Sequence, residues 1–420
     1  MGGAKVIAIG QGGGPTPVIN SQVAGVLYEA KHSNVRKILG LRNGLEGLLY
    51  DCPENIVDIT DLNPFSIKTV PGAVLGTTRI KLDKDKDDDK IEIIKKRMHE
   101  NSIDALIYFG GNDSSYVLQS LGDGFIFVHG AKTIDNDLPC CHHTPGFGSA
   151  ALFNAKAIRN LALDLFSFKK MVRDMSGKIV YGETSAVIYQ VMGRDTGWLA
   201  MASAFAKVDE GGTINSSFPP HIVWPAELEF DEERYLNSAE NFLMKEGKVF
   251  IVVSEGVSKT IDGKKVSLAE LCGEVKRDEH GHTDYGRTDK SAAEYLSGLL
   301  KKINIRCIQK IKSTQILPQH LQRCYEISLQ DSAEAFLVGR ESLRAVMDGN
   351  HQVSIVLKES NTYSAKPARV PLSEIAGKVR YVPSEYYNGN NITGPTQSFI
   401  DEFIPAIGSL EQLPSYFELK

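Results

Sequence analysis

Residues Tyr108–Pro139 decide the fold of this chain, and they read YFGGNDSSYVLQSLGDGFIFVHGAKTIDNDLP. One apolar run ends in a glycine pair, a helix-like piece follows, and a second apolar run ends in an acidic cluster. This alternation is typical of parallel strands in an α/β sheet, whose carboxyl ends meet at one ligand-binding edge. The pattern therefore predicts that polar residues from two stretches lie close together: Asn112, Asp113, Lys132, Asp135 and Asp137.

The acidic cluster places Asp135 and Asp137 on either side of Asn136, with Lys132 three residues before the first. A neighbouring lysine favours ionised carboxylates at neutral pH. One such carboxylate can take a proton from a hydroxyl, and the other can hold a divalent metal directly or through water. The alternative is a polar turn with an Asx cap. The second polar cluster, Gly110–Ser114, favours a functional site.

Length and composition limit the class of protein. A chain of 420 residues is too long for one ordinary core, so two domains are expected. A hydrophobic content of 42%, a charged content of 24% and a net charge of −5 indicate a globular protein and argue against a general nucleic-acid binder. The six cysteines form no CxxC pair, which is typical of free thiols in a reducing cytoplasm. No signal peptide or membrane span is expected.

The N-terminal segment has the order strand, glycine loop, helix. The apolar run Lys5–Gly10 precedes Gln11–Pro17, and a helical pattern covers Val18–Ala30. Backbone N–H groups of such a loop, at a helix N-terminus, bind phosphate. The alternative is a tight turn needed only for packing, because the loop is neither GxGxxG nor a Walker motif.

The segment KTIDND after a strand, with GG-x-D-S one strand earlier, resembles the phosphofructokinase family, and specifically its pyrophosphate-dependent branch. The resemblance extends to about Gly349. It implies two Rossmann-like three-layer α/β domains with mostly parallel sheets and an active site in the cleft between them. It also implies interleaved domains: residues 1–147 plus about 321–390 for the donor and Mg²⁺, and residues 148–320 plus about 391–420 for the sugar phosphate.

On the donor side, the resemblance implies that Gly13 and Gly14 contact the phosphoryl donor and that Arg79 faces it. In ATP-using members a glycine stands at the position of Asp113, where a carboxylate clashes with and repels an α-phosphate and adenosine. Lys132 likewise replaces a glycine of ATP users and can neutralise the moving phosphoryl group. Asn112 occupies the place of the family's metal-side aspartate, so Asn112 and Asp137 are the predicted metal-side residues. Arg79 has the alternative of an ordinary surface arginine.

On the sugar side, the resemblance rests on MGR, SEG and HxQR segments. It implies that Asp135 is the base, assisted by Lys132. The implied substrate-binding residues are Thr133, Asp135, Asp137, Met192, Gly193, Arg194, Glu255, His320 and Arg323. Two of them have structural alternatives, since Arg194 can pair with Asp195 and Glu255 can be a cap or surface residue.

The chain departs from the family at three further places. Gln319 stands where the family has a glycine before the histidine, so the local turn is expected to differ. No arginine stands near Ser185, where many members place one that acts across a subunit interface. Only Lys310 and Lys312 stand near the second such position. The resemblance still implies a homo-oligomer, a dimer or tetramer.

The predicted reaction is reversible transfer from pyrophosphate to the 1-hydroxyl of fructose 6-phosphate, a glycolytic or gluconeogenic step. Three alternatives stay open: ATP as the donor, sedoheptulose 7-phosphate or another sugar phosphate as the acceptor, and a non-catalytic sensor that kept the fold. The intact KTIDND segment argues against the sensor, because a binding protein has no use for a base beside a lysine.

Overall fold

The computed structural model describes residues 5–50, 52–167, 171–173, 176–177, 179–181, 184–277, 288–303, 311–359, 365–387 and 392–415. The chain divides into two compact units. Unit 1 comprises residues 1–150, 323–380 and 405–408, and unit 2 comprises residues 151–322, 381–404 and 409–420. Among the described residues, no helix is long and apolar enough to cross a membrane.

Unit 1 is built on a seven-stranded sheet with the order β15-β14-β5-β4-β1-β2-β3, and the two edge strands are antiparallel to their neighbours. The strands are β1 (Lys5–Gln11), β2 (Val35–Leu41), β3 (Ile56–Asp58), β4 (Ala105–Gly110), β5 (Ile126–Ala131), β14 (Val353–Lys358) and β15 (Lys366–Pro371). The helices are α1 (Ile19–Ala30), α2 (Glu46–Leu49), α3 (Pro64–Ile67), α4 (Asp88–Glu100), α5 (Asn112–Ser120) and α10 (Leu329–Met347).

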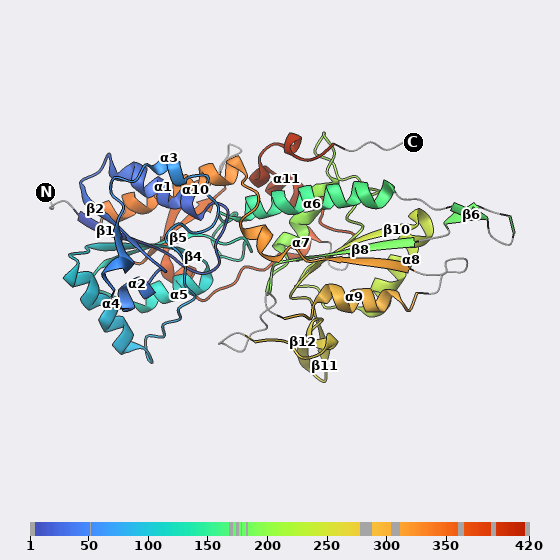
Figure 1. The fold of residues 1–420 in the computed structure, drawn as a ribbon, viewed down its shortest axis with the longest axis horizontal. Helices are drawn as coiled ribbons and strands as arrows, with labels where there is room; N and C mark the ends of the chain where they lie inside the picture. Colours follow the sequence, from blue (N-terminus) through green and yellow to red (C-terminus); the bar gives the residue numbers. More distant parts are fainter. Residues whose placement is uncertain are drawn as a thin grey trace. The chain divides into compact units, whose positions relative to one another are not determined.

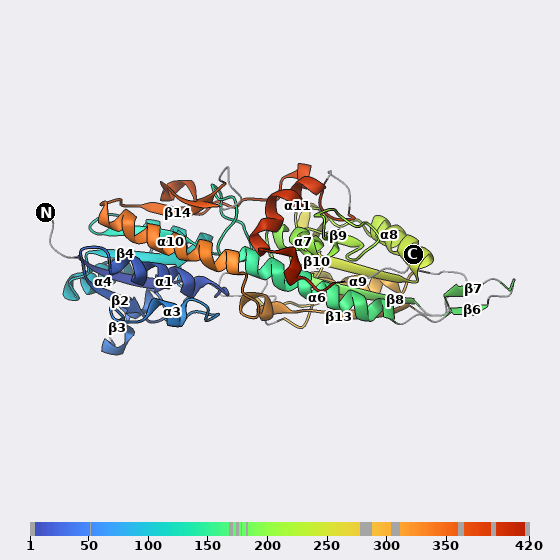
Figure 2. The same cartoon turned by 90° about the horizontal axis from the view of Figure 1, so that it is seen from above.

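The central strands of unit 1, β1, β4 and β5, are buried on both faces because helices cover both faces of the sheet. Successive residues of a strand point to opposite sides, so Ile7 and Ile9 pack with α1 and α10, whereas Val6 and Ala8 pack with α4 and α5. Figure 1 and Figure 2 show α1 and α10 side by side on one face of this sheet. These three layers confirm the predicted fold class for unit 1.

Unit 2 is built on a four-stranded parallel sheet with the order β13-β8-β10-β9. Its strands are β8 (Thr184–Val191), β9 (Ile222–Trp224), β10 (Lys248–Ser254) and β13 (Ile311–Ile316), and two hairpins are formed by β6 (Met171–Arg173) with β7 (Ile179–Tyr181) and by β11 (Ser258–Ile261) with β12 (Lys264–Ser267). Its helices are α7 (Trp198–Ala202), α8 (Glu232–Glu246), α9 (Ala292–Leu300), α11 (Gln397–Phe403) and most of α6 (Phe147–Ser167). In Figure 1, α6 and α9 lie over opposite faces of this sheet.

Three elements differ from what the sequence pattern predicts, which is a helix over Ser115–Leu121, one strand over Ile179–Gln190 and a helix over Leu199–Ala206. The helix after GGNDS begins at Asn112 rather than Ser115, because Gly111 takes the N-cap position and leaves the polar residues inside the first turn. The expected strand Ile179–Gln190 corresponds to two strands of different sheets, β7 and β8, and residues 182–183 lie outside the described part. The expected helix Leu199–Ala206 is the short α7 followed by a 3₁₀ segment, Ser203–Lys207.

Helices α1 and α10 approach so closely that two glycines are required at their contact. A Cβ atom added at Gly25 would lie 2.1 Å from the carbonyl oxygen of Phe336, and one added at Gly339 would lie 1.9 Å from that of Gln22. Both obstacles are backbone atoms of the opposite helix, which a rotamer change cannot move. The close packing of α10 against α1 therefore requires that neither Gly25 nor Gly339 carries a side chain.

Replacing Gly339 by alanine should destabilise the protein by roughly 1–3 kcal/mol, the usual cost of overpacking. The matched control is Gly298→Ala in α9, where a Cβ would meet nothing within 4 Å. That substitution should stabilise the protein by roughly 0.5–1 kcal/mol, because alanine has the better helix propensity. Thermal unfolding of the two variants and the native protein measures both effects. Equal shifts in the same direction would contradict the close-contact interpretation.

Candidate active site

The polar residues of the first stretch lie at one edge of the unit 1 sheet. Strands β4 and β5 are parallel neighbours with Gly110 opposite Ala131, and the N–H of Lys132 donates to the Gly110 carbonyl at 3.0 Å. The segments that follow both strands therefore leave the sheet at the same edge. Asn112 and Asp113 form the first turn of α5 there, with the Asp113 residue exposed to solvent.

Lys132 is the buried cation of this edge. Its residue is 2% exposed, and its Nζ donates to the carbonyl oxygen of Gly14 at 2.7 Å. Burial, followed by the charge of Arg323, lowers the pKa of Lys132 to about 7, while Asp135 and Asp137 act in the opposite direction. The Lys132 side chain thus contacts the glycine loop and lies within electrostatic reach of both carboxylates.

The glycine loop needs its glycines for two physical reasons. Gly13 has a φ of 74°, in the left-handed region that residues with a side chain rarely adopt. A Cβ added at Gly14 would lie 3.1 Å from Cζ of Arg323, so the loop leaves room for that guanidinium. Arg79 is exposed, and its charge also lowers the pKa of Lys132 after burial and Arg323. Gly14, Lys132 and Arg323 therefore lie close together, with Arg79 within electrostatic reach.

The acidic loop, residues 132–137, is folded back on residues 142–146. The buried Asn136 has a φ of 56°, and its Oδ1 accepts from the N–H of Thr144 at 3.0 Å. The Thr144 hydroxyl donates to the carbonyl of Thr133 at 2.7 Å, and the Thr133 N–H donates to the carbonyl of Pro145 at 3.2 Å. Asparagine tolerates left-handed backbone better than most residues. The turn that separates the two carboxylates is thus fixed from within the loop.

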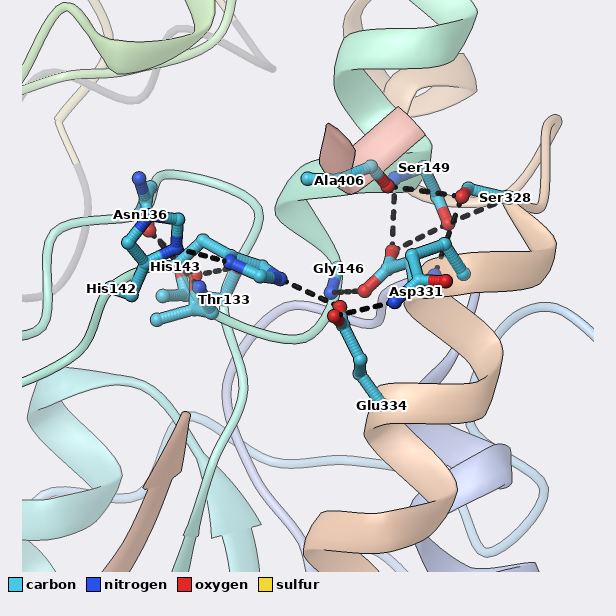
Figure 3. Close-up of polar contacts among 12 residues, drawn as sticks. Thr133, Asn136, His142, His143, Gly146, Ser149, Ser328, Asp331, Glu334 and Ala406 are labelled. Carbon is cyan, nitrogen blue, oxygen red and sulfur yellow. Dashed lines mark hydrogen bonds and ion pairs between the residues drawn. The ribbon is translucent and has the colours of Figure 1, made fainter. Parts of the chain in front are cut away.

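Helix α10 holds the far side of this loop, as Figure 3 shows. The fully buried Asp331 accepts from the N–H groups of Gly146 and Ser149, both at 2.9 Å, and from the Ser149 hydroxyl at 2.6 Å. One turn further on, Glu334 accepts from Nε2 of His143 at 2.7 Å. Burial raises the pKa of Asp331 to about 6, and these donors act against the rise. Both carboxylates therefore attach residues 143–149 to α10.

Asn112 and Asp137 fit the metal side of a phosphate site. The buried Oδ1 of Asn112 has no hydrogen-bond partner, while its Nδ2 donates to the carbonyl of Lys378. Mg²⁺ typically takes one or two protein oxygens and completes its shell with water and substrate phosphates. Within the described residues, no group of three His, Cys, Asp or Glu side chains is placed to hold a metal alone. The Asn112 Oδ1 could therefore serve as one protein ligand of a divalent cation whose other ligands come from water or substrate.

The MGR and SEG segments leave the unit 2 sheet at a common edge. Strands β8 and β10 are parallel, and the N–H of Gly193 donates to Oε1 of Glu255 at 3.3 Å. A Cβ added at Gly256 would lie 1.7 Å from the carbonyl oxygen of Arg194, so glycine is required where these segments touch. Met192 follows β8 directly, and its N–H donates to Oε1 of Gln322 at 3.3 Å.

Three predicted sugar-side residues have informative surroundings. Arg194 forms an ion pair with Asp195 (Nε to Oδ2, 2.9 Å), which was the structural alternative for this residue. The 3₁₀ segment Gln319–Arg323 crosses the boundary between the units: the exposed His320 belongs to unit 2, whereas Arg323 belongs to unit 1 and lies at Gly14. The structure thus brings Arg323 to the donor-side residues.

The departures from the family have structural counterparts. Gln319 has a φ of 43°, so the residue in the glycine position still adopts left-handed backbone. Ser185 pairs in register with Lys248 on one side and Lys312 on the other, and the Lys248 Nζ donates to the Ser185 hydroxyl at 3.3 Å. Lysines therefore flank the position that lacks an arginine. Lys310 lies outside the described residues.

Residues 6–346 match the protein family described as Phosphofructokinase. The chain belongs to the phosphofructokinase family. It is 31% identical over 404 residues to the pyrophosphate–fructose 6-phosphate 1-phosphotransferase of Rhodospirillum rubrum, with 92% of this chain and 91% of that protein covered. It is also 28% identical to the sulfofructose kinase of Alkalicoccus urumqiensis, with 90% of this chain and 91% of that protein covered. The crystal structure of the pyrophosphate-dependent phosphofructokinase from Marinobacter aquaeolei has the same fold, with a TM-score of 0.75 at 24% identity over 96% of this chain and 91% of that one.

Several residues around the predicted site were not identified from sequence. Gln322 stands inside HxQR, yet its role is to connect Met192 with Asn154, whose Nδ2 donates to the Gln322 Oε1 at 3.1 Å. Its place within a recognised motif was a usable signal. No sequence signal indicated the roles of Asp331 and Glu334, because polar residues one turn apart on an amphipathic helix normally face solvent.

Replacing Lys132 by methionine should change how stability depends on pH. Because the folded pKa of Lys132 is about 7 and its ordinary value is 10.5, the unfolded chain binds more protons at this residue between those two values. The stability of the native protein therefore rises with pH across that window, and the variant lacks this contribution. Urea unfolding at constant ionic strength measures the difference in unfolding free energy between the variant and the native protein. This difference should favour the variant most at the lower end of the pH window and less towards its upper end. A pH-independent difference would contradict the lowered pKa.

Proposed function

We propose that this phosphofructokinase transfers a phosphoryl group reversibly from pyrophosphate to the 1-hydroxyl of fructose 6-phosphate, giving fructose 1,6-bisphosphate and phosphate. The observation that carries the proposal is the buried Lys132, which donates to the Gly14 carbonyl at 2.7 Å and is influenced by both Asp135 and Asp137. A cation between a glycine loop and two carboxylates suits phosphoryl transfer, where positioning and charge stabilisation dominate. The relative from Rhodospirillum rubrum, named for the same reaction, supports it.

The proposed roles follow from the chemistry of each group. Asp135 takes the proton of the sugar 1-hydroxyl as the oxygen attacks phosphorus. Lys132 and the backbone of Gly13 and Gly14 stabilise the charge on the transferring group. A phosphate that binds at Lys132 adds negative charge and shifts this amine towards its protonated form. Binding of the donor therefore favours the protonated form of Lys132, which is the form that stabilises the phosphate charge.

Asn112 and Asp137 are the residues that would hold Mg²⁺ on the donor side. The partnerless Oδ1 of Asn112 is the structural support for this assignment. When bound, the ion would supply neutralisation of the donor's phosphate charge. Asp137 would orient the ion or the substrate, beside the base at Asp135.

We assign unit 1 to the donor and unit 2 to the sugar phosphate. In unit 2, Glu255 accepts from sugar hydroxyls, and Met192, Gly193, Arg194 and His320 bind the sugar phosphate. In unit 1, Thr133 and Asp137 contact the substrate, and Arg323 adds a guanidinium for phosphate. The homo-oligomer and the cytoplasmic location, in glycolysis or gluconeogenesis, stay predictions, and sedimentation of the purified protein measures the first.

Initial rates with separate donors test the reaction directly. With fructose 6-phosphate and Mg²⁺, the protein should turn over with pyrophosphate and show at least ~10-fold less activity with ATP, because the exposed Asp113 repels an additional phosphate and nucleoside. Pyrophosphate should also be offered with sedoheptulose 7-phosphate and with sulfofructose, the sugar named for one relative. Faster turnover of either sugar would replace the acceptor in this proposal. Activity with ATP alone would overturn the donor assignment.

The double variant Asp113→Gly, Lys132→Gly is the control for the donor assignment. It should lose most activity with pyrophosphate and gain use of ATP, because glycine at both positions leaves room for the nucleotide. An unchanged preference for pyrophosphate would show that other residues select the donor.

Asp135→Asn should lower kcat by roughly 10²–10⁴, the usual contribution of a general base, with little change in the KM values. The amide keeps the size of the side chain and removes its basicity. Asp123→Asn, at an exposed carboxylate that pairs with His351, is the matched control and should leave kcat unchanged. Steady-state kinetics with pyrophosphate measures both variants. A kcat for Asp135→Asn within threefold of the native value would favour the non-catalytic sensor.

A further inference from the structure

Arg380, in the C-terminal segment of unit 1, binds the outer side of the acidic loop. Its Nε and one terminal nitrogen donate to the carbonyl of Asn136 at 3.2 and 2.8 Å. The other terminal nitrogen donates to the carbonyl of His142 at 2.9 Å and to that of Cys141. Its backbone N–H donates to the carbonyl of Asp137 at 2.7 Å. One residue thus contacts both arms of the folded loop.

The carbonyls that Arg380 binds belong to a turn that cannot satisfy them alone. Asn136 is fully buried and left-handed, so its carbonyl lies outside any regular hydrogen-bond pattern. A buried carbonyl without a donor costs roughly 1–3 kcal/mol. A guanidinium offers five N–H donors in a rigid fork and can bind several carbonyls at fixed spacing, whereas an ammonium is a single point. The chemistry of this contact is therefore specific to arginine.

The neighbouring backbone of the same segment reaches the metal-side residue. The carbonyl of Lys378 accepts from Nδ2 of Asn112, which leaves the Asn112 Oδ1 available. Residues 378–380 therefore contact Asn112 at the start of α5 and Asn136–Asp137 after β5. The segment fixes the spacing between the two stretches that carry the donor-side oxygens and the base.

We propose that Arg380 is a positioning residue for phosphoryl transfer, holding Asn136 so that the carboxylates on either side of it keep their places. The reaction named here rests on the proposed function, whereas the holding of the loop rests only on the contacts above. A displacement of about 1 Å in an active site costs roughly 100-fold in rate. Residue 380 lies beyond residue 346, the end of the family match, so this support comes from outside the matched segment.

Three variants test the inference: Arg380→Ala, Arg380→Lys and the control Arg369→Ala. Arg369 is also a tail arginine of unit 1 with several hydrogen bonds, but its partners are Glu341, Asp348 and Asn350, away from the acidic loop. The control therefore also removes an arginine of unit 1 with several hydrogen bonds, but it leaves the contacts of the acidic loop in place.

Hydrogen–deuterium exchange of a peptide covering residues 132–146 is the readout that does not depend on activity. Exchange of this peptide should rise in Arg380→Ala and Arg380→Lys and stay at the native level in Arg369→Ala. Native exchange in both Arg380 variants would overturn the inference. If Arg380→Ala does not fold, Arg380→Lys, which keeps the charge and the stem, decides the result.

Kinetics separates positioning from general stability. In Arg380→Ala, kcat should fall about 100-fold while the KM for fructose 6-phosphate changes less than threefold. Millimolar guanidinium chloride should restore part of this kcat, compared with sodium chloride at the same concentration, because the free guanidinium ion can bind where the Arg380 side chain was removed. Arg369→Ala should keep the native kcat. A kcat loss of the same size in both alanine variants, or no rescue, would contradict the inference. A native protein inactive with pyrophosphate and fructose 6-phosphate would instead overturn the proposed function, and the exchange result would still decide whether Arg380 holds the loop.

Discussion

The candidate site depends on one constraint: the backbone N–H and C=O groups of its buried loop must find hydrogen-bond partners. Lys132, Thr133 and Asn136 are buried although they follow the end of a strand and belong to no helix or sheet. Their carbonyls and N–H groups find partners in distant segments, chiefly residues 144–146 and Arg380. The scaffolding of the loop follows from this need, because each missing donor or acceptor would leave an unpaired group in the interior.

The same burial sets the electrostatics of the donor side. Transfer of the Lys132 ammonium out of water lowers its pKa to about 7, and the neighbouring Arg323 adds to the effect. The two carboxylates only partly compensate. Such a group is poised near neutral pH, so its charge responds to what binds beside it. In the proposed reaction, the negative charge of a phosphate donor beside Lys132 would raise the pKa of this amine and favour its protonated form.

Local patterns were sufficient to predict the sheet edge from sequence. The apolar runs that became β1, β4, β5 and β10 are bounded by glycine or polar residues, and their lengths fit strands buried on both faces. The predicted start of a helix was wrong where several residues could take the N-cap position. The run GGNDSS offers several N-cap candidates, and Gly111 took the position instead of a residue with a side-chain acceptor.

The supports of the loop could not be predicted, because they join residues far apart in the chain. Arg380 and Asn136 are separated by 244 positions, and Asp331 and Gly146 by 185. An arginine that binds carbonyls has the same local sequence as one that faces water, and a helical aspartate at the first turn is ordinary in sequence. Only the folded topology, which returns α10 and the tail to the unit 1 sheet, gives these residues their partners.

Arg323 shows the same limit within a recognised motif. HxQR reads as one unit in sequence, yet its histidine belongs to unit 2 and its arginine to unit 1, where Cζ lies 3.1 Å from a Cβ position at Gly14. The charge of Arg323 lowers the pKa of Lys132, second only to burial. Whatever phosphate the guanidinium contacts, its field acts on the donor lysine. A residue predicted to bind the sugar phosphate therefore lies beside the glycine loop and lowers the pKa of Lys132, which the motif HxQR by itself does not indicate.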